Sequence, residues 1–189
     1  LNMGMKTLLA FEWLEQNYEY DFVVRPTPSS YINHDNLVNF IKSNLLDDKY
    51  IYAGKLQTTN NKHKEPIDFI SGSTFILNRA SVQRILENKN KWDHSYWDDV
   101  ALSILMSDLN IEYQETERFD VTGNPLEQYI PTSFYQYRCR ADNHYGYPRY
   151  LESINLKLIH KISNNQKLNG VSKILLDIFY NISKFFYIY

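Results

Sequence analysis

One stretch of this chain constrains its fold more than any other. An apolar run, IDFISGSTFILN (residues 67–78), passes directly into a helical pattern, RASVQRILEN (residues 79–88). The run is rich in β-branched and aromatic residues, which favours a buried strand, and Asn78 can cap the helix that follows. Val82 and Ile85 then recur at the spacing of one helical face. A strand joined to a helix without a linker predicts an α/β fold.

The first 115 residues repeat this alternation. Helices are predicted over residues 3–17, 35–45 and 98–109, and further strands over residues 21–25, 49–56 and 111–113. Leu9, Trp13 and Leu14 are predicted to face the core from the first helix, and Asp35 is predicted to cap the second. Because strands and helices alternate, we expect an α/β domain with a mixed, mostly parallel sheet flanked by helices.

Composition narrows the classes of partner. The chain has 189 residues, enough for one domain with an appendage, and its 20 basic residues against 22 acidic ones leave a net charge of −2. That balance argues against a nucleic-acid partner. Cys139 is the sole cysteine, which excludes an internal disulfide and a Cys-based zinc site and fits a reducing, cytoplasmic location. The chain begins with Leu1 and enters a helical pattern almost at once, so we expect a fragment that lacks part of an N-terminal half.

Adjacent carboxylates open the helix in YWDDVALSILM (residues 96–106). One interpretation is structural: Asp98 caps the helix and Asp99 interacts with its macrodipole. The other is chemical: one carboxylate caps while the other projects into a cleft as a general base. Tyr96 and Trp97 could then form a wall on which an acceptor sugar stacks.

Gly72 interrupts the apolar strand, with Ser71 and Ser73 on either side. A glycine weakens a strand unless a bulge forms there or another group approaches the backbone closely. The sequence leaves both interpretations open.

An arginine-rich segment, YQYRCRADNHYGYPR (residues 135–149), follows the alternating region. Guanidinium groups form forked hydrogen bonds with phosphate oxygens, so Arg138, Arg140 and Arg149 could hold a diphosphate, with His144 nearby. The alternative is a solvated basic loop whose arginines pair with acids such as Asp142.

In this order, VVRPTPSSYIN, FISGSTFILNRASVQRIL and YWDDVALSILMSDLNIEY resemble the second half of a GT-A glycosyltransferase domain. The resemblance is to the fringe and β-1,3-galactosyltransferase type, including small transferases of large DNA viruses and bacteria, and it covers about residues 5–115. It implies an inverting transfer of a sugar from a nucleotide-diphosphate donor to an acceptor hydroxyl of a glycan. Asp99 would be the base, Asp98 its capping or orienting partner, and Gly72 would let the donor sugar lie against the strand.

The resemblance also implies a set of donor-binding residues in three segments. They are Arg25, Thr27, Ser29, Ser30, Ser71, Gly72, Ser73, Arg138, Arg140, His144 and Arg149. Where the family carries metal-binding carboxylates, however, this chain has Thr27-Pro28-Ser29-Ser30, so we name no metal ligand. A divalent cation, manganese or magnesium, is left open as a cofactor, although its usual acidic motif is missing. Either arginines neutralise the leaving group instead, or the chain binds the donor weakly.

Two other functions are alternatives to sugar transfer. The missing acidic motif favours a catalytically silent domain that binds carbohydrate or nucleotide. A glycoside hydrolase needs two carboxylates on opposite sides of a sugar, which adjacent Asp98 and Asp99 do not supply.

The C-terminal segment is predicted to be separate from the transferase domain. We expect residues 1–160 to form that domain and residues 161–189 to form an apolar or amphipathic helix. The apolar stripe over residues 171–189 packs on protein in one interpretation and lies on a membrane surface in the other.

Overall fold

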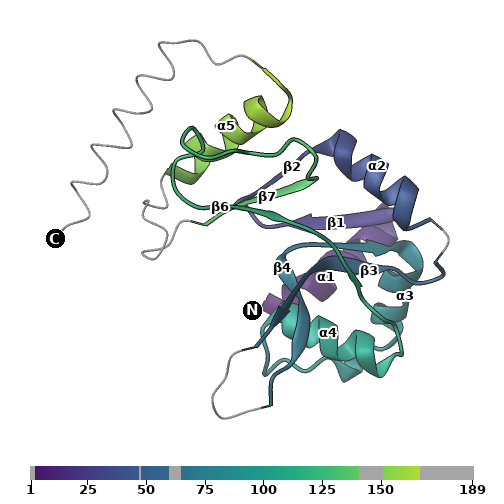
Figure 1. Cartoon of the computed structure of the whole chain (residues 1–189). Helices are drawn as coiled ribbons and strands as arrows, with labels where there is room; N and C mark the ends of the chain where they lie inside the picture. The colour runs from purple at the N-terminus through teal and green to yellow at the C-terminus, as the bar shows by residue number, and fades with distance from the viewer. Residues whose placement is uncertain (1–2, 47, 60–64, 141–150, 167–189) are drawn as a thin grey trace. The chain divides into compact units, whose positions relative to one another are not determined.

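The computed structural model describes residues 3–46, 48–59, 65–140 and 151–166, which fall into two compact units (Figure 1). Unit 1 comprises residues 1–27 and 44–117, and unit 2 comprises residues 28–43 and 118–189. Both units mix strands with helices, so the predicted α/β class is confirmed at that level.

The sheet of unit 1 has the strand order β1-β4-β3-β5. Its strands are β1 (Phe22–Pro26), β3 (Tyr52–Thr58), β4 (Asp68–Asn78) and β5 (Gln114–Glu115). Both neighbours of β4 run antiparallel to it, and only the short β5 runs parallel to β3. The expectation of a mostly parallel sheet is therefore wrong. The polar run after Gln57 joins β3 and β4 directly, closed by a 2.9 Å hydrogen bond from the Thr59 N–H to the Ile67 carbonyl, and such a connection makes neighbours antiparallel.

The serine- and glycine-rich part of β4 leaves the ladder with β3. Leu56 pairs with Ile70 and Gly54 with Phe75, so residues 71–74 lie opposite the single residue Lys55. On its other side β4 pairs with β1 only from Thr74, which lies opposite Pro26, to Asn78, which lies opposite Phe22. The pairing with β3 is therefore irregular around Gly72, as a bulge would make it, and the strand nevertheless continues to Asn78.

The helices of unit 1 are α1 (Met3–Asn17), α3 (Arg79–Glu87) and α4 (Asp98–Asp108), with a short 3-10 turn, η1 (Lys89–Lys91). Buried side chains of β3, β4 and the three helices form one core, including Tyr52, Phe75, Leu102 and Leu105. Asn78 caps α3 as predicted, because its side chain accepts a 3.0 Å hydrogen bond from the Ser81 N–H. No strand forms over residues 111–113, where one was predicted, and β5 follows at Gln114–Glu115.

The buried face of α1 is only partly the predicted one. Leu14 packs against the core as predicted, but Leu9 and Trp13 are exposed, and Leu8 and Phe11 contribute to the core instead. Gly4 lies on the buried face, where an added Cβ would come within 2.4 Å of the Trp92 indole nitrogen, so a side chain there would collide. The missing side chain of Gly4 allows α1 to pack closely against Trp92. Close packing therefore decides which face of α1 is buried, more than the positions of its large apolar side chains do.

Unit 2 contains a second sheet, with the order β2-β7-β6. Its elements are β2 (Ser30–Ile32), β6 (Phe119–Val121), β7 (Gln136–Cys139), α2 (His34–Asn44) and α5 (Glu152–Ser163). β2 is antiparallel and β6 parallel to β7. None of these three strands was predicted from the sequence, and each has only three or four residues.

The start of α2 also differs from the prediction. Asp35 lies inside the first turn and is exposed, while the Asn33 side chain accepts a 3.1 Å hydrogen bond from the Asn36 N–H. Asn33 is therefore the capping residue. At the other end of the chain, the predicted domain boundary at residue 160 falls inside α5.

No helix among the described residues is long and apolar enough to cross a membrane. Of the helix predicted over residues 161–189, residues 161–163 belong to α5 and residues 167–189 lie outside the described residues, as do His144 and Arg149.

Glu15 ties α1 to α3 and should make stability depend on pH. Its carboxylate accepts hydrogen bonds from the Tyr20 hydroxyl (2.6 Å), Gln83 Nε2 (3.0 Å) and Arg79 Nε (3.3 Å). Burial raises the pKa of Glu15, but these hydrogen bonds and the charge of Arg79 outweigh it and lower the pKa below its usual range. The stabilisation is present above the unfolded pKa of about 4.3 and is lost as pH falls through the lower folded value.

We expect Glu15→Gln to lower the free energy of unfolding by about 1 kcal/mol at pH 7, a value discounted for the partial exposure of Arg79. The difference from the unsubstituted chain should shrink toward pH 3, as measured by urea unfolding at both pH values. Glu87→Gln, on the exposed side of α3, is the matched control and should change little. A Glu15→Gln effect that stays constant with pH would contradict this role.

Candidate functional site

Asp99 lies in the first turn of α4, and its carboxylate faces the bulged part of β4. Its Oδ2 accepts a 2.9 Å hydrogen bond from the Gly72 N–H, and its Oδ1 accepts a 3.0 Å hydrogen bond from the Val100 N–H. The residue is half-buried. An ionised carboxylate has about four lone-pair positions, so two backbone donors leave capacity for a further partner.

Gly72 makes room for this carboxylate. A Cβ added at Gly72 would lie 3.0 Å from Asp99 Oδ2 and 3.2 Å from Asp99 Cβ, which is tighter than ordinary packing. The sequence predicted that the missing side chain admits a donor sugar. In the structure the group that approaches the glycine is Asp99, and the bulge brings the Gly72 N–H to it.

Asp98 has a different environment from its neighbour. Its side chain is 5% exposed and forms a 2.6 Å ion pair with Arg25 Nη2 from β1, and its Oδ2 also accepts a 3.2 Å hydrogen bond from Thr7 Oγ1 of α1. The N-cap residue of α4 is Trp97, which makes no side-chain capping bond, so Asp98 is not the cap that the sequence predicted. It holds the start of α4 against β1 and α1 instead.

Arg25 was predicted to bind the donor. Besides its ion pair with Asp98, its guanidinium carbon lies 5.3 Å from the centroid of the Phe75 ring. The structure thus places this arginine in the contact that anchors α4.

A buried pair of hydroxyls holds α4 to the sheet one turn beyond Asp99. Ser103 Oγ donates to the Asp99 carbonyl (3.0 Å), accepts from the Ile70 N–H (3.1 Å) and lies 2.6 Å from the Tyr52 hydroxyl. Because the single proton of Ser103 is directed to the carbonyl, Tyr52 is the donor in the last contact. Burial raises the pKa of Tyr52 above its usual range, with the charges of Asp99 and Asp98 adding to it, so this hydroxyl keeps its proton.

The other predicted site residues of unit 1 lie in β4, just after β1 and just before α4. Ser71 and Ser73 are buried and their hydroxyls are 3.2 Å apart, while the Thr27 N–H donates to the Ser73 carbonyl at 2.9 Å. Trp97 is 75% exposed beside the acid pair, whereas Tyr96 packs partly against the core.

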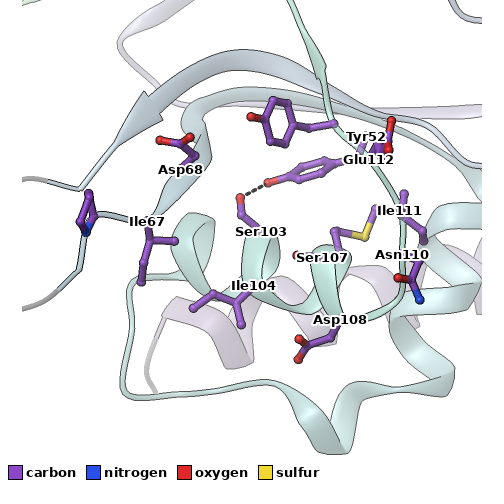
Figure 2. Close-up of a pocket in the computed structure, with 13 residues that line it drawn as sticks. Tyr52, Ile67, Asp68, Ser103, Ile104, Ser107, Asp108, Asn110, Ile111 and Glu112 are labelled. Carbon is purple, nitrogen blue, oxygen red and sulfur yellow. Dashed lines mark hydrogen bonds between the residues drawn. The ribbon is translucent and has the colours of Figure 1, made fainter.

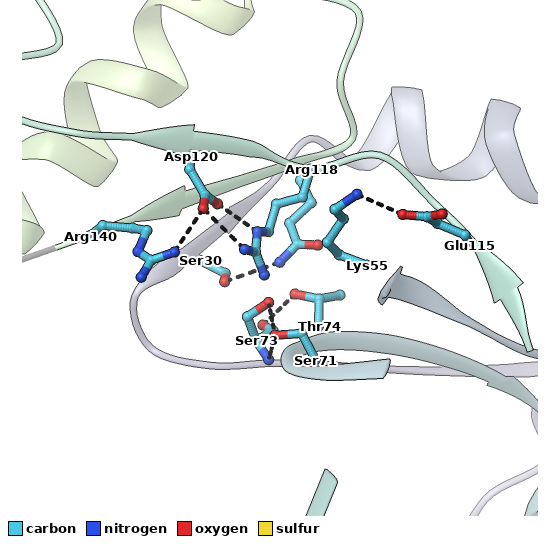
Figure 3. Close-up of polar contacts among 10 residues, drawn as sticks. Ser30, Lys55, Ser71, Ser73, Thr74, Glu115, Arg118, Asp120 and Arg140 are labelled. Carbon is cyan, nitrogen blue, oxygen red and sulfur yellow. Dashed lines mark hydrogen bonds and ion pairs between the residues drawn. The ribbon is translucent and has the colours of Figure 1, made fainter. Parts of the chain in front are cut away.

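Unit 2 contains two arginines that share one carboxylate, as Figure 3 shows. Arg118 binds Asp120 through Nε (2.5 Å) and Nη2 (3.0 Å), and Arg140 Nη1 lies 3.1 Å from the same carboxylate. Arg118 and Arg140 therefore converge on the same carboxylate. Arg118 and Asp120 were not predicted as site residues. Their spacing of two residues, which places both on one face of an extended strand, was the available signal.

Ser29, Ser30 and Arg138 also lie in unit 2. Ser30 is opposite Arg138 in the β2–β7 ladder, and the Ser29 hydroxyl donates to Glu152 Oε2 at 3.1 Å. The predicted donor residues therefore form two groups: Arg25, Thr27, Ser71, Gly72 and Ser73 in unit 1, and Ser29, Ser30, Arg138 and Arg140 in unit 2.

The described residues do not fit a divalent metal. Thr27 to Ser30 supply no carboxylate, and the described part of the chain contains no group of three or more His, Cys, Asp or Glu side chains that could hold an ion. Hard cations bind anionic oxygen ligands, which these hydroxyls do not replace.

Comparison with known proteins gives the family. A family model described as Galactosyltransferase matches residues 1–117, which include α1, the bulged strand and the acid pair of α4. A search of curated proteins found no match. The match spans more than half of the sequence, and it confirms the resemblance inferred from the order of the motifs. This chain belongs to the galactosyltransferase family.

Proposed function

We propose that this chain is an inverting glycosyltransferase, which moves a hexose from a nucleotide-diphosphate sugar to an acceptor hydroxyl of a glycan. Family membership supports glycosyl transfer, and the details of donor, acceptor and stereochemistry are our proposal. Asp99 supports it most directly, because a half-buried carboxylate is held by two backbone N–H groups and keeps lone pairs for a substrate.

In the proposed reaction, Asp99 accepts the proton of the acceptor hydroxyl. The acceptor oxygen forms a bond to the anomeric carbon from the face opposite the leaving group. The bond between that carbon and the diphosphate oxygen breaks, and the diphosphate leaves with the electron pair. One proton transfer and one displacement thus convert donor and acceptor into the glycoside and the nucleotide diphosphate.

Asp98 is the poorer choice for the base. Its carboxylate is buried and is occupied by Arg25 and Thr7, so proton transfer to it would break the ion pair that anchors α4. Asp98 therefore acts as a positioning residue, which fixes the helix that carries Asp99.

Unit 2, taken by itself, contains guanidinium groups suited to a nucleotide diphosphate. Because the metal-binding carboxylates of the family are missing, we propose that these arginines bind the diphosphate. Arg118 and Arg140 bring two positive charges to the Asp120 carboxylate. Arg138 of β7 lies opposite Asp120 of β6 in the sheet. Arginine suits diphosphate because its planar donors match pairs of phosphate oxygens.

Charge reversal at Arg140 should weaken the binding of nucleotide diphosphate. A lost charge-assisted hydrogen bond corresponds to roughly 1.5–3 kcal/mol, and we expect Kd for UDP or GDP to rise by about tenfold or more in Arg140→Glu. Isothermal titration measures this. Lys157→Glu, which makes the same charge change on the exposed side of α5, is the control and should leave Kd nearly unchanged. Equal Kd values for Arg140→Glu and the unsubstituted protein would remove the diphosphate assignment.

A second function has one specific observation in its favour. Thr27 to Ser30 carry no acid, so the chain could bind carbohydrate or nucleotide without catalysis. Incubating the purified protein with UDP-, GDP- and dTDP-sugars, with and without manganese, separates the two functions. Release of nucleotide diphosphate supports the transferase, and binding of a donor without release in either condition supports the silent domain.

A further inference from the structure

A pocket of about 860 Å³ opens in unit 1, away from the Asp99 carboxylate. Its walls come from the residues at the start of β4, from the last two turns of α4 and from the segment that follows α4 (Figure 2). Figure 2 shows Ile67 and Asp68 on one side and Ser103, Ile104 and Ser107 of α4 on the other. Its volume lies within the range of roughly 300–1,000 Å³ that small-molecule sites occupy.

The lining excludes two kinds of ligand. Among the described residues that line the pocket, none is Lys, Arg or His, so a nucleotide diphosphate would find no positive charge here. A divalent metal is also disfavoured, because the acidic residues of this wall do not form a metal-binding group within the described chain.

The same lining suits a neutral sugar. The carboxylates of Asp68, Asp108 and Glu112 accept hydrogen bonds from hydroxyl groups, and the hydroxyl of Ser107 can both donate and accept. Tyr113, which is 41% exposed, offers an aromatic face to the C–H groups of a sugar ring.

Ser103 connects the pocket to the proposed base. Its side chain lines the pocket, while its hydroxyl holds the Asp99 carbonyl and the Ile70 N–H. Asp99 and Ser107 lie on the same α-helix, separated by about 12 Å along its axis at 1.5 Å per residue. That separation exceeds one sugar ring and suits an acceptor of several sugars.

We propose that this pocket is a second carbohydrate subsite, which holds a non-reacting sugar of an oligosaccharide acceptor while another sugar of the same chain reaches Asp99. This inference rests on the proposed transferase function. It deepens that function by naming the acceptor class as a neutral glycan of more than one sugar.

The test is saturation-transfer NMR of the full chain, without donor, in the presence of lactose, maltotriose and cellotriose. We expect at least one of these oligosaccharides to bind. Ser107→Arg should weaken that binding by about tenfold or more, because the larger arginine side chain would occupy space at this exposed position of the pocket wall. Tyr113→Ala is a second variant, which removes the aromatic face without adding a charge, and should weaken binding in the same direction. Ser43→Arg, at an exposed position of α2, is the matched control.

Each outcome decides the proposal. Failure of all three oligosaccharides to bind, or equal binding by Ser107→Arg, Tyr113→Ala and the control, would overturn the subsite. Glycan binding should persist in Asp99→Asn, because Asp99 does not line the pocket. Loss of transfer in Asp99→Asn with this binding intact supports both proposals, whereas retained transfer removes the base and leaves the glycan subsite standing.

Discussion

Asp99→Asn is expected to abolish sugar transfer and to leave donor binding nearly unchanged. The amide cannot accept the proton of the acceptor hydroxyl, and general-base catalysis contributes roughly 10²–10⁴-fold. Its side-chain oxygen can still accept the hydrogen bond from the Gly72 N–H, so the geometry of α4 against β4 should persist. Transfer is measured with the nucleotide sugar that gives the largest thermal shift in a screen of UDP-, GDP- and dTDP-sugars, and donor binding by titration.

Asp35→Asn is the matched control for this substitution. Asp35 is an exposed residue in the first turn of α2, so the same chemical change should alter neither transfer nor donor binding. If Asp99→Asn keeps its transfer rate, or loses donor binding as strongly as transfer, Asp99 is not the base.

The pair Arg25–Asp98 should give the largest loss of stability. Removing one partner of a buried ion pair leaves a charge without compensation, which costs about 3–5 kcal/mol when both partners are buried. Asp98 is 5% exposed and Arg25 is 34% exposed, so the cost depends on which charge remains. We expect the free energy of unfolding to fall by about 3 kcal/mol in Arg25→Met, which leaves the more buried charge of Asp98 without its partner. In Asp98→Asn it should fall by about 2 kcal/mol.

The double variant Arg25→Met/Asp98→Asn tests whether these losses share one cause. With both charges removed, its stability should lie above the value expected from adding the two single losses, as measured by urea unfolding. Strict additivity would show that the two side chains act independently. Asp48→Asn, an exposed acid of unit 1, provides the comparison for a surface carboxylate.

The local features of unit 1 could be predicted from the sequence because they are determined by neighbouring residues. Asn78 precedes a helical pattern and caps it, and α4 begins at Asp98 as expected. The sheet was predicted less well. The polar composition of the run after Gln57 does not distinguish a hairpin from a crossover, and this distinction decides whether the two strands are antiparallel.

Residues of the candidate site were predicted better than their roles. The acid pair and Gly72 do lie together, but Asp98 pairs with Arg25 from β1 and Gly72 accommodates Asp99. These contacts join residues that are distant in sequence, and no local pattern encodes them. The prediction of the buried face of α1 was partly wrong for a similar reason. Gly4 permits close packing against Trp92, which hydrophobic periodicity does not reveal.

The discontinuity of unit 2 has a practical consequence for anyone who trims this protein. The family match ends at residue 117, yet residues 28–43, which lie within it, belong to unit 2. The backbone partner of β2 is β7, and Asn36 at the start of α2 donates to the carbonyls of Thr132 and Phe134. A polypeptide that ends at Glu117 would keep β2 but lose β7, the strand that pairs with it. Unpaired strands of this kind template intermolecular association, so recombinant material shortened to the family boundary should aggregate where the longer chain does not.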